Sequence, residues 1–286
     1  MSDIMPEPFV IDCGTVRIVG DRWVAHPSSG APIILLHGGG QTRHSWDRSA
    51  SALAARGRNV YTIDLRGHGD SSWAADGDYG IDAFVADLRH VIETIGQAPI
   101  LIGASLGGIT SLCAAGEHSG TAAALVMVDV VVHVEPEGIE RIKTFMTDHI
   151  GGFATLDDVA DAIAAYNPGR ERPGSLEGLK KNVRLHDDGR WYWHWDPQFI
   201  VSSGNEARRH TDPVRLGAAA RRVDVPTLIV RGGESDVVSE AGVASMLELV
   251  PHADVADVTA AGHMVAGDDN QVFAAAIHEF LDRHEF

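Results

Sequence analysis

The chain has 286 residues, of which 44% are hydrophobic and 22% are charged, as expected of an ordinary globular protein with one large α/β domain. Its 40 acidic residues outnumber its 23 basic residues, which gives a formal net charge of −17. This balance argues against nucleic acid as a partner, because phosphate binding requires clusters of lysine and arginine. An acidic surface also slows the approach of anionic substrates.

No segment has the pattern of a signal peptide or of a membrane-spanning helix. The N-terminus, MSDIMPEPFV, carries acids where a signal peptide needs positive charge. No apolar run approaches the ~18 residues of a spanning helix. Cys13 and Cys113 provide no framework of disulfide bridges, and Cys113 lies in an apolar helical stretch typical of a core. We therefore expect a cytoplasmic protein that does not bind membranes.

Short apolar runs alternate with helical patterns along most of the chain. Buried strands are predicted at PIILL (32–36), NVYTI (59–63), PILIG (99–103), ALVMV (124–128), TLIVR (227–231) and 254–258. Helices are predicted over residues 45–57, 79–96, 105–118, 240–250 and 269–284. Such alternation predicts an α/β fold with a parallel sheet covered by helices on both faces. Residues 10–24 are expected to add an antiparallel hairpin at the sheet edge.

The alternation stops between residues 134 and 213. This stretch is helical in pattern but irregular, and it contains a dense aromatic run, RWYWHWDPQF (190–199). We interpret residues 134–213 as a helical cap inserted across one end of the sheet. Residues 1–133 and 214–286 then form the core domain.

Ser105 lies where a predicted strand meets a predicted helix, in the segment GASLG. A G-x-S-x-G pattern at such a junction is typical of a nucleophile elbow, and the sharp turn requires small residues at positions 103 and 107. The turn would aim the backbone N–H of Leu106 at the same point, and the helix N-terminus favours a developing anion there. The alternative, a loop serine that caps a helix, is disfavoured by the strand and helix on either side.

A serine nucleophile needs a base to take its proton. His263 follows the strand predicted at 254–258 and begins the connection to the last helix. Because loops at the carboxyl ends of parallel strands gather at one sheet edge, His263 is predicted to meet Ser105 there as the general base. Asp236, in the loop after the strand at 227–231, is the predicted buried acid that orients the histidine. Glu234 and Asp129 remain alternatives for this role.

Acyl transfer also needs donors for the oxyanion. The strand PIILL leads into HGGG (37–40), where glycine leaves backbone N–H groups unobstructed. Gly39 is the preferred donor alongside Leu106, and Gly38 is a substitute. The order serine, acid, histidine along the chain is the one expected of this hydrolase architecture.

These motifs resemble those of the α/β-hydrolase superfamily over nearly the whole chain. The matching stretches are LLHGGG (35–40), DLRGHGDSS (64–72), GASLGG (103–108), RGGESD (231–236) and AGHM (261–264). The resemblance implies an eight-stranded, mostly parallel sheet, a cap after the sixth strand, no cofactor and a serine hydrolase mechanism. The stretch matching DLRGHG is mainly structural in relatives, so no chemistry is assigned to Asp64, Arg66 or His68.

Departures from subfamily patterns narrow the expected activity. Epoxide hydrolases and haloalkane dehalogenases place an aspartate at the elbow, where this chain has Ser105. Hydrolases that cleave C–C bonds of ring-fission products usually have a serine-glycine-proline oxyanion loop and a tryptophan after the histidine. This chain has Gly-Gly-Gln at 39–41 and Met264. C–C hydrolysis is therefore an alternative, and a cofactor-free oxygenase is a further one.

The aromatic run in the cap predicts an apolar pocket that excludes water. The residues predicted to contact substrate are Gly38, Trp46, Trp191, Trp193 and Met264. No matched spacing of ligands predicts a metal site. The predicted function is hydrolysis of a small-molecule carboxylic ester or lactone with a bulky apolar portion, without cofactor. A non-catalytic or slow small-molecule-binding protein on the same fold is the alternative from another class, and the oligomeric state is not predicted.

Overall fold

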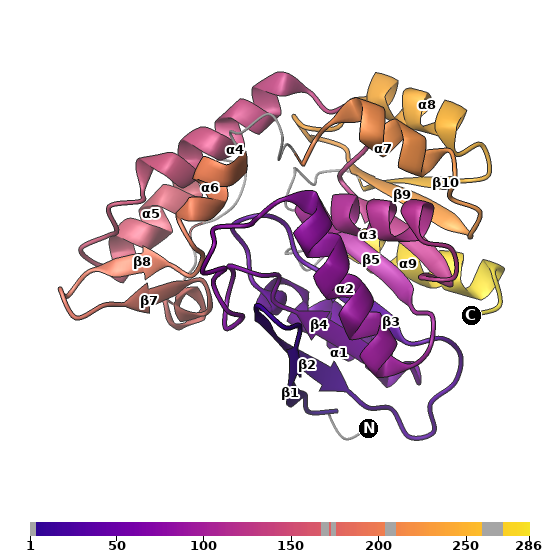
Figure 1. Ribbon diagram of the computed structural model, residues 1–286, viewed down its shortest axis with the longest axis horizontal. Helices are drawn as coiled ribbons and strands as arrows, with labels where there is room; N and C mark the ends of the chain where they lie inside the picture. The colour runs from indigo at the N-terminus through magenta and orange to yellow at the C-terminus, as the bar shows by residue number, and fades with distance from the viewer. Residues whose placement is uncertain (1–3, 167–171, 173–175, 204–209, 259–270) are drawn as a thin grey trace.

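An eight-stranded sheet forms the centre of the molecule (Figure 1). The computed structural model describes residues 4–166, 172, 176–203, 210–258 and 271–286. The strands of the sheet are β1 (Glu7–Asp12), β2 (Arg17–Trp23), β3 (Ile33–Leu36), β4 (Val60–Ile63), β5 (Ile100–Ala104), β6 (Ala124–Val128), β9 (Thr227–Gly232) and β10 (Asp254–Val258). Their order is β1-β2-β4-β3-β5-β6-β9-β10.

The six strands from β4 to β10 in this order are parallel, and β1 and β2 add an antiparallel hairpin at one edge. β3, β5 and β6 are buried along their whole length, because helices cover both faces. This confirms the predicted α/β-hydrolase fold with its mostly parallel sheet. The carboxyl ends of β3, β5, β6, β9 and β10 all lie at the same edge, where loops that follow them meet.

Six helices pack against the sheet in two layers. They are α1 (Asp47–Ala55), α2 (Ile81–Ile95), α3 (Leu106–Glu117), α7 (Pro213–Ala220), α8 (Glu240–Leu249) and α9 (Gln271–Arg283). Alternate residues of β3 face opposite layers, as strand geometry requires. Ile34 and Leu36 belong to the apolar cluster under α2, α3, α7 and α8, whereas Ile33 and Leu35 belong to the cluster under α1 and α9.

The cap elements lie between β6 and α7 and gather on one side of the sheet (Figure 1). They are α4 (Pro136–Asp148), α5 (Leu156–Tyr166), a 3₁₀ helix (Glu177–Lys181), β7 (Val183–Leu185), β8 (Trp191–Trp193) and α6 (Gln198–Ser203). Besides these helices, the cap contains a short antiparallel hairpin formed by β7 and β8. Placing the cap boundaries at residues 134 and 213 stays an interpretation.

Charged groups tie the cap hairpin to the core. Arg43, in a 3₁₀ turn (Arg43–Trp46) after β3, is buried and forms ion pairs with Asp21, Asp64 and Asp70. The second oxygen of Asp70 accepts a hydrogen bond from Arg184 of β7 at 2.5 Å. Asp70 therefore bridges a buried core guanidinium and an exposed cap guanidinium. No helix in the described part of the chain is long and apolar enough to cross a membrane.

Candidate active site

Ser105 sits on a sharp turn between β5 and α3. Its backbone has φ 46° and ψ −112°, a left-handed conformation that side chains rarely adopt and that costs about 1–3 kcal/mol. The Ser105 N–H donates to the carbonyl of Val128 at 3.1 Å, and the Ser105 carbonyl accepts from Ile109 at 2.9 Å. The neighbouring strand and the first turn of α3 thus hold the strained residue in place.

Glycines on either side of Ser105 allow this turn to pack. A Cβ at Gly103 would lie 2.3 Å from the carbonyl carbon of Gly107. A Cβ at Gly107 would lie 2.5 Å from the carbonyl oxygen of Leu36, at the end of β3. Both contacts are with backbone, which cannot move aside without disturbing the sheet or the helix. The G-x-S-x-G spacing is therefore a steric requirement of the observed turn.

The loop after β3 presents its glycines to the same cavity as Ser105. The Gly38 N–H donates to Oε1 of Gln41 at 3.0 Å, and the Gly40 N–H donates to Nε2 of His68 at 3.0 Å. Within the described residues, no acceptor takes the N–H of Gly39 or that of Leu106. These two amides, one from the loop and one from the start of α3, are the ones available to a ligand in the cavity.

Two buried histidines hold the glycine loop. His37 donates from Nδ1 to the carbonyl of Gly38 at 2.7 Å and accepts from the N–H of Leu65 at Nε2, at 3.0 Å. His68 donates from Nδ1 to the carbonyl of Arg66 at 3.0 Å, which leaves Nε2 as the acceptor for Gly40. Each ring must be neutral to accept a hydrogen bond.

The same two rings have strongly lowered pKa values. Burial lowers the pKa of His37 to about 4 and that of His68 to about 3. In addition, the charge of Arg43 opposes protonation of His37, and His37 opposes protonation of His68. Both rings are therefore neutral near pH 7. No chemistry was predicted for His68, and in the structure it supports the glycine loop by accepting the hydrogen bond from Gly40.

Three carboxylates are candidates for the acid of the triad, and the surroundings of Asp129 and Asp236 differ. Asp129 directly follows β6, is 1% exposed and has a positive φ of 48°. Its carboxylate accepts hydrogen bonds from the N–H of Gly232 at 2.9 Å and from Oγ of Ser235 at 2.6 Å. Because Val128, its neighbour, accepts from Ser105, Asp129 lies at the sheet edge beside the elbow.

Asp236 has a different setting from the buried acid that was predicted. Its side chain is 36% exposed and forms an ion pair with Arg141 of α4 at 2.9 Å. The expectation that Asp236 is buried was therefore wrong, because the loop after β9 turns it toward the cap helix. Glu234, the other alternative in this loop, is exposed.

The predicted base His263 and the predicted contact Met264 lie outside the described residues. The strand that precedes them, β10, ends at Val258 on the same edge of the sheet as β5. Two other histidines line the cavity, His133 and His210. His210 donates from Nε2 to the carbonyl of Tyr79 at 2.5 Å, and burial lowers its pKa. Neither histidine could be predicted from a sequence pattern, because the place of both in the lining depends on how the cap packs.

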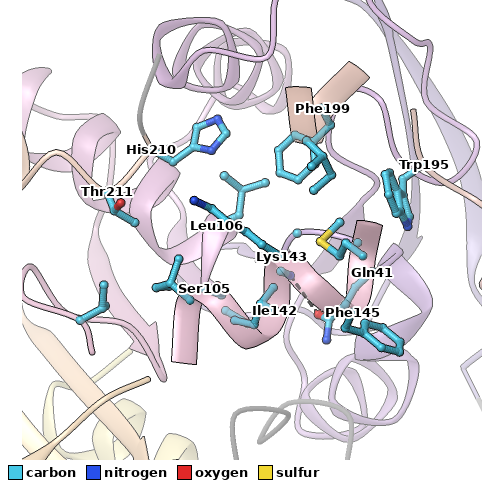
Figure 2. Close-up of a pocket in the computed structure, with 18 of the residues that line it drawn as sticks. Gln41, Ser105, Leu106, Ile142, Lys143, Phe145, Trp195, Phe199, His210 and Thr211 are labelled. Carbon is cyan, nitrogen blue, oxygen red and sulfur yellow. Dashed lines mark hydrogen bonds between the residues drawn. The ribbon is translucent and has the colours of Figure 1, made fainter. Parts of the chain in front are cut away.

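A cavity of about 820 Å³ lies between the sheet edge and the cap. Its floor includes Ser105, Leu106 and the glycine loop, and its cap side includes α4 residues and aromatic rings (Figure 2). The aromatic residues that line it are Phe145, Tyr166, Trp193, Trp195 and Phe199. Such a volume accommodates a small organic molecule and buries most of its surface.

The predicted substrate contacts divide into three groups. Gly38 and Trp193 line the cavity, as predicted. Trp46 does not line it, because its ring is completely buried beside Phe273 of α9, on the other face of the sheet. Trp191 is also absent from the described lining, since it packs within the cap hairpin and its small apolar cluster. The sequence prediction missed Trp195 and Phe199, although both belong to the aromatic run.

The ring of Phe199 packs against the glycine loop and the histidine that supports it. It lies edge-on to His68 with ring centroids 4.9 Å apart and stacks on His210 at 5.5 Å. A Cβ at Gly39 would lie 3.3 Å from the Phe199 ring. The cap thus touches the loop that carries the Gly39 amide.

The chain is similar to known hydrolases in sequence and to a solved hydrolase structure in fold. An esterase of Mycobacterium tuberculosis is 28% identical over 285 residues, which cover 97% of this chain and 90% of the relative. The 2-(acetamidomethylene)succinate hydrolase of Mesorhizobium japonicum is 26% identical over 288 residues, which cover 98% of each chain. A crystal structure of E-2-(acetamidomethylene)succinate hydrolase superposes with a TM-score of 0.84 at 23% identity, over 97% of this chain and 100% of that chain.

The family model described as the alpha/beta hydrolase family matches residues 33–276. This range begins at β3, runs through the elbow and the whole cap, and reaches into α9. The match covers most of the chain and includes every element that forms the cavity floor. The chain therefore belongs to the alpha/beta hydrolase family.

Proposed function

We propose that this hydrolase cleaves a carboxylic ester or lactone with a bulky apolar portion, with Ser105 as the nucleophile. The observation that carries the proposal is the strained turn at Ser105, which opens into an aromatic-lined cavity beside two available amides, those of Gly39 and Leu106. An esterase of similar length among the relatives supports the ester class.

The mechanism assigns one role to each group. Oγ of Ser105 attacks the substrate carbonyl while His263 accepts its proton. The N–H groups of Gly39 and Leu106 donate to the oxyanion of the tetrahedral intermediate, and each such donor contributes about 10²–10³ in rate. His263 then protonates the departing alcohol, which leaves an acyl-enzyme at Ser105. Water, deprotonated by His263, attacks that ester and releases the acid.

Asp129 orients His263 in this mechanism, in preference to Asp236. A triad acid works best when it is buried and held by hydrogen bonds, so that it stabilises the imidazolium without being screened. Asp129 meets both conditions, and it follows the strand next to the elbow strand. Asp236 is partly exposed and its charge is already matched by Arg141.

A non-ester substrate is the second candidate. A relative that matches 98% of each chain is named a 2-(acetamidomethylene)succinate hydrolase, and that substrate is not an ester by its name. The same nucleophile and oxyanion donors serve hydrolysis of an amide, or of a C–C bond next to a carbonyl, as well as ester cleavage. The two candidates therefore share the site and differ in the bond that it breaks.

The test measures hydrolysis of 4-nitrophenyl esters of increasing acyl length and of a panel of lactones, by wild type, Ser105→Ala and Ser119→Ala. Ser119 is an exposed residue just after α3 and serves as the matched control. We expect Ser105→Ala to lower kcat by at least about 10⁴-fold and Ser119→Ala to leave it unchanged. A fluorophosphonate should label wild type once, at Ser105, as an intact-mass shift.

Activity that persists in Ser105→Ala would show that another group is the nucleophile. Labelling of Ser105 without ester or lactone hydrolysis would favour the second candidate, and 2-(acetamidomethylene)succinate is then the first substrate to try. If wild type neither reacts with the probe nor hydrolyses any ester, the chain is a binding protein on this fold.

A further inference from the structure

A lysine of the cap projects into the cavity that contains Ser105. Lys143 belongs to α4, whose cavity face otherwise carries mainly apolar residues, including Ile139, Ile142 and Met146. Figure 2 shows its side chain extended from α4 into the cavity. Among the described residues that line the cavity, Lys143 is the single lysine or arginine. The mechanism of ester cleavage gives this charge no role.

Lys143 also differs from other basic residues of the cap in its partners. Arg141, two positions earlier, pairs with Asp236, while Lys181 pairs with Asp47 at 2.7 Å and Arg184 pairs with Asp70 at 2.5 Å. In the parts of the chain that the structure describes, Lys143 forms neither an ion pair nor a side-chain hydrogen bond. Lys143 is an exposed residue of the lining, so water screens an ion pair at its ammonium in part, and the attraction for an anion is that of a partly exposed cation.

Two polar residues of the lining lie on the side of the cavity toward which this ammonium points. Figure 2 shows the end of the Lys143 side chain on the side where His210 and Thr211 lie, away from Phe145 and Trp195. His210 has one ring nitrogen engaged by the carbonyl of Tyr79. A ligand anion at Lys143 would lie on the same side of the cavity as His210 and Thr211, and the apolar part of the ligand would contact the aromatic rings of the lining.

The acidic side chain on this face of α4 is Glu140. It lines the cavity one turn before Lys143, and the two are not paired in the structure. Its negative charge weakens the attraction of Lys143 for an anion without cancelling it. This predicts opposite effects for the removal of the two charges.

We propose that Lys143 binds a carboxylate on the substrate, at the end away from the bond that is cleaved. The inference rests on the proposed function and specifies its substrate class: half-esters of dicarboxylic acids. One ammonium without a neighbouring arginine suits a monoanionic carboxylate, which needs a single charge partner, better than a phosphate dianion. The acidic surface repels such a substrate at long range, so a local cation inside the cavity is what retains it.

The experiment compares monobutyl glutarate with butyl pentanoate, two esters that differ by a carboxylate in place of a methyl group. Release of acid is followed in a pH-stat, and the readout is the ratio of kcat/KM for the anionic ester to that for the neutral ester. The neutral ester reports any general damage in each variant. Monobutyl succinate and monobutyl adipate then show which chain length spans from Ser105 to Lys143.

The variants are Lys143→Met, Lys143→Glu, Glu140→Gln and the control Lys180→Met. Lys180 lies outside the cavity, in the 3₁₀ helix at Glu177–Lys181, and its loss changes the net charge by the same amount. We expect the ratio to fall about 3- to 10-fold in Lys143→Met, because solvent screens an ion pair at an exposed lysine in part. It should fall further in Lys143→Glu, rise in Glu140→Gln and stay unchanged in Lys180→Met.

Equal ratios in Lys143→Met and Lys180→Met would overturn the inference while leaving ester hydrolysis intact. If neither ester is hydrolysed, calorimetric titration of monobutyl glutarate into Ser105→Ala decides. Binding that disappears in Ser105→Ala/Lys143→Met supports the carboxylate site and overturns the ester chemistry. Binding that is absent, or that persists without Lys143, overturns the carboxylate site itself.

Discussion

The floor and the cap side of the cavity are built in different ways. On the floor, short motifs set the geometry: two glycines admit the turn at Ser105, and two neutral histidines fix the loop that carries Gly39. The cap side collects single side chains from α4, β8 and α6, and few of them are held by hydrogen bonds. The floor is therefore suited to one kind of chemistry, whereas the cap side can change its residues and select different substrates.

This difference has a physical basis in crowding. At the floor, backbone atoms of β3, β5 and α3 approach so closely that a single Cβ would collide with them. Substitution there disturbs the sheet, so the residues and their spacing are constrained together. In the cap, the contacts are between side chains and not between backbone atoms. Neighbouring rings can therefore shift when a substitution changes the size of a side chain.

The largest effect is expected from the acid beside the elbow. Asp129→Asn should lower kcat by about 10⁴-fold, because an amide in this position favours the wrong tautomer of the base. Asp236→Asn removes only a partly exposed ion pair with Arg141 and should change kcat by less than about threefold. Steady-state kinetics on one ester, with circular dichroism to show that both variants fold, makes the comparison.

A large loss of kcat in Asp236→Asn with little change in Asp129→Asn would reverse the assignment. The buried carboxylate of Asp129 would then serve to hold Gly232 and Ser235, and its replacement would lower stability more than activity. Losses of similar size in both variants would indicate that the two acids act in one network.

The fold and the floor of the cavity could be predicted from the sequence because both depend on patterns of residues that are close together in the chain. Buried strands are short apolar runs, and the elbow is a glycine-serine-glycine spacing at a strand end, so neither depends on distant contacts. The choice between Asp129 and Asp236 could not be made in this way. Both follow strands of the same sheet, but Asp129 is buried and bound by Gly232 and Ser235, whereas Asp236 is partly exposed and pairs with Arg141 of α4.

The aromatic residues were predicted with less success for the same reason. Trp46 follows the glycine loop in sequence, but the 3₁₀ turn carries its ring to the opposite face of the sheet, against Phe273. In the run at 190–199, Trp191 and Trp193 share a face of β8, but Trp193 lies in the described cavity lining and Trp191 does not. Composition indicated an apolar cavity, but only the fold shows which rings form it.

A smaller effect is expected from the histidine that supports the glycine loop. His68→Phe removes the acceptor of the Gly40 N–H, which leaves a partly buried donor unsatisfied and lets the loop move away from the oxyanion position. We expect kcat to fall about 10- to 100-fold, less than for loss of an oxyanion donor itself, with KM little changed. His68→Gln, whose side-chain oxygen can accept the same hydrogen bond, should recover part of the rate. A change confined to KM would argue against this role.

The same histidine also makes stability depend on pH. His68 in the folded chain stays neutral down to about pH 3, whereas in the unfolded chain it takes up a proton near pH 6.5. Acidification therefore favours the unfolded state, and the folded state loses about 1.4 kcal/mol per pH unit below 6.5 from this residue. Between pH 7.5 and pH 5 in urea titrations, wild type should lose about 2 kcal/mol more than His68→Gln. His90→Gln, on the exposed side of α2, is the control and should follow wild type.

The smallest effect is expected where the cap hairpin meets the core. Arg184 and Asp70 form an exposed ion pair, with side chains 51% and 43% accessible, so solvent screens most of their attraction. Arg184→Met should therefore lower the free energy of unfolding by less than about 1 kcal/mol. Asp70 keeps its second partner, the buried Arg43, which holds the core side of this contact in place. Because the hairpin carries Trp193, a loosened contact should appear as a modest rise in KM for bulky esters with kcat unchanged. A loss of kcat as large as that of His68→Phe would mean that the cap positions the floor, and the distinction between the two sides of the cavity would fail.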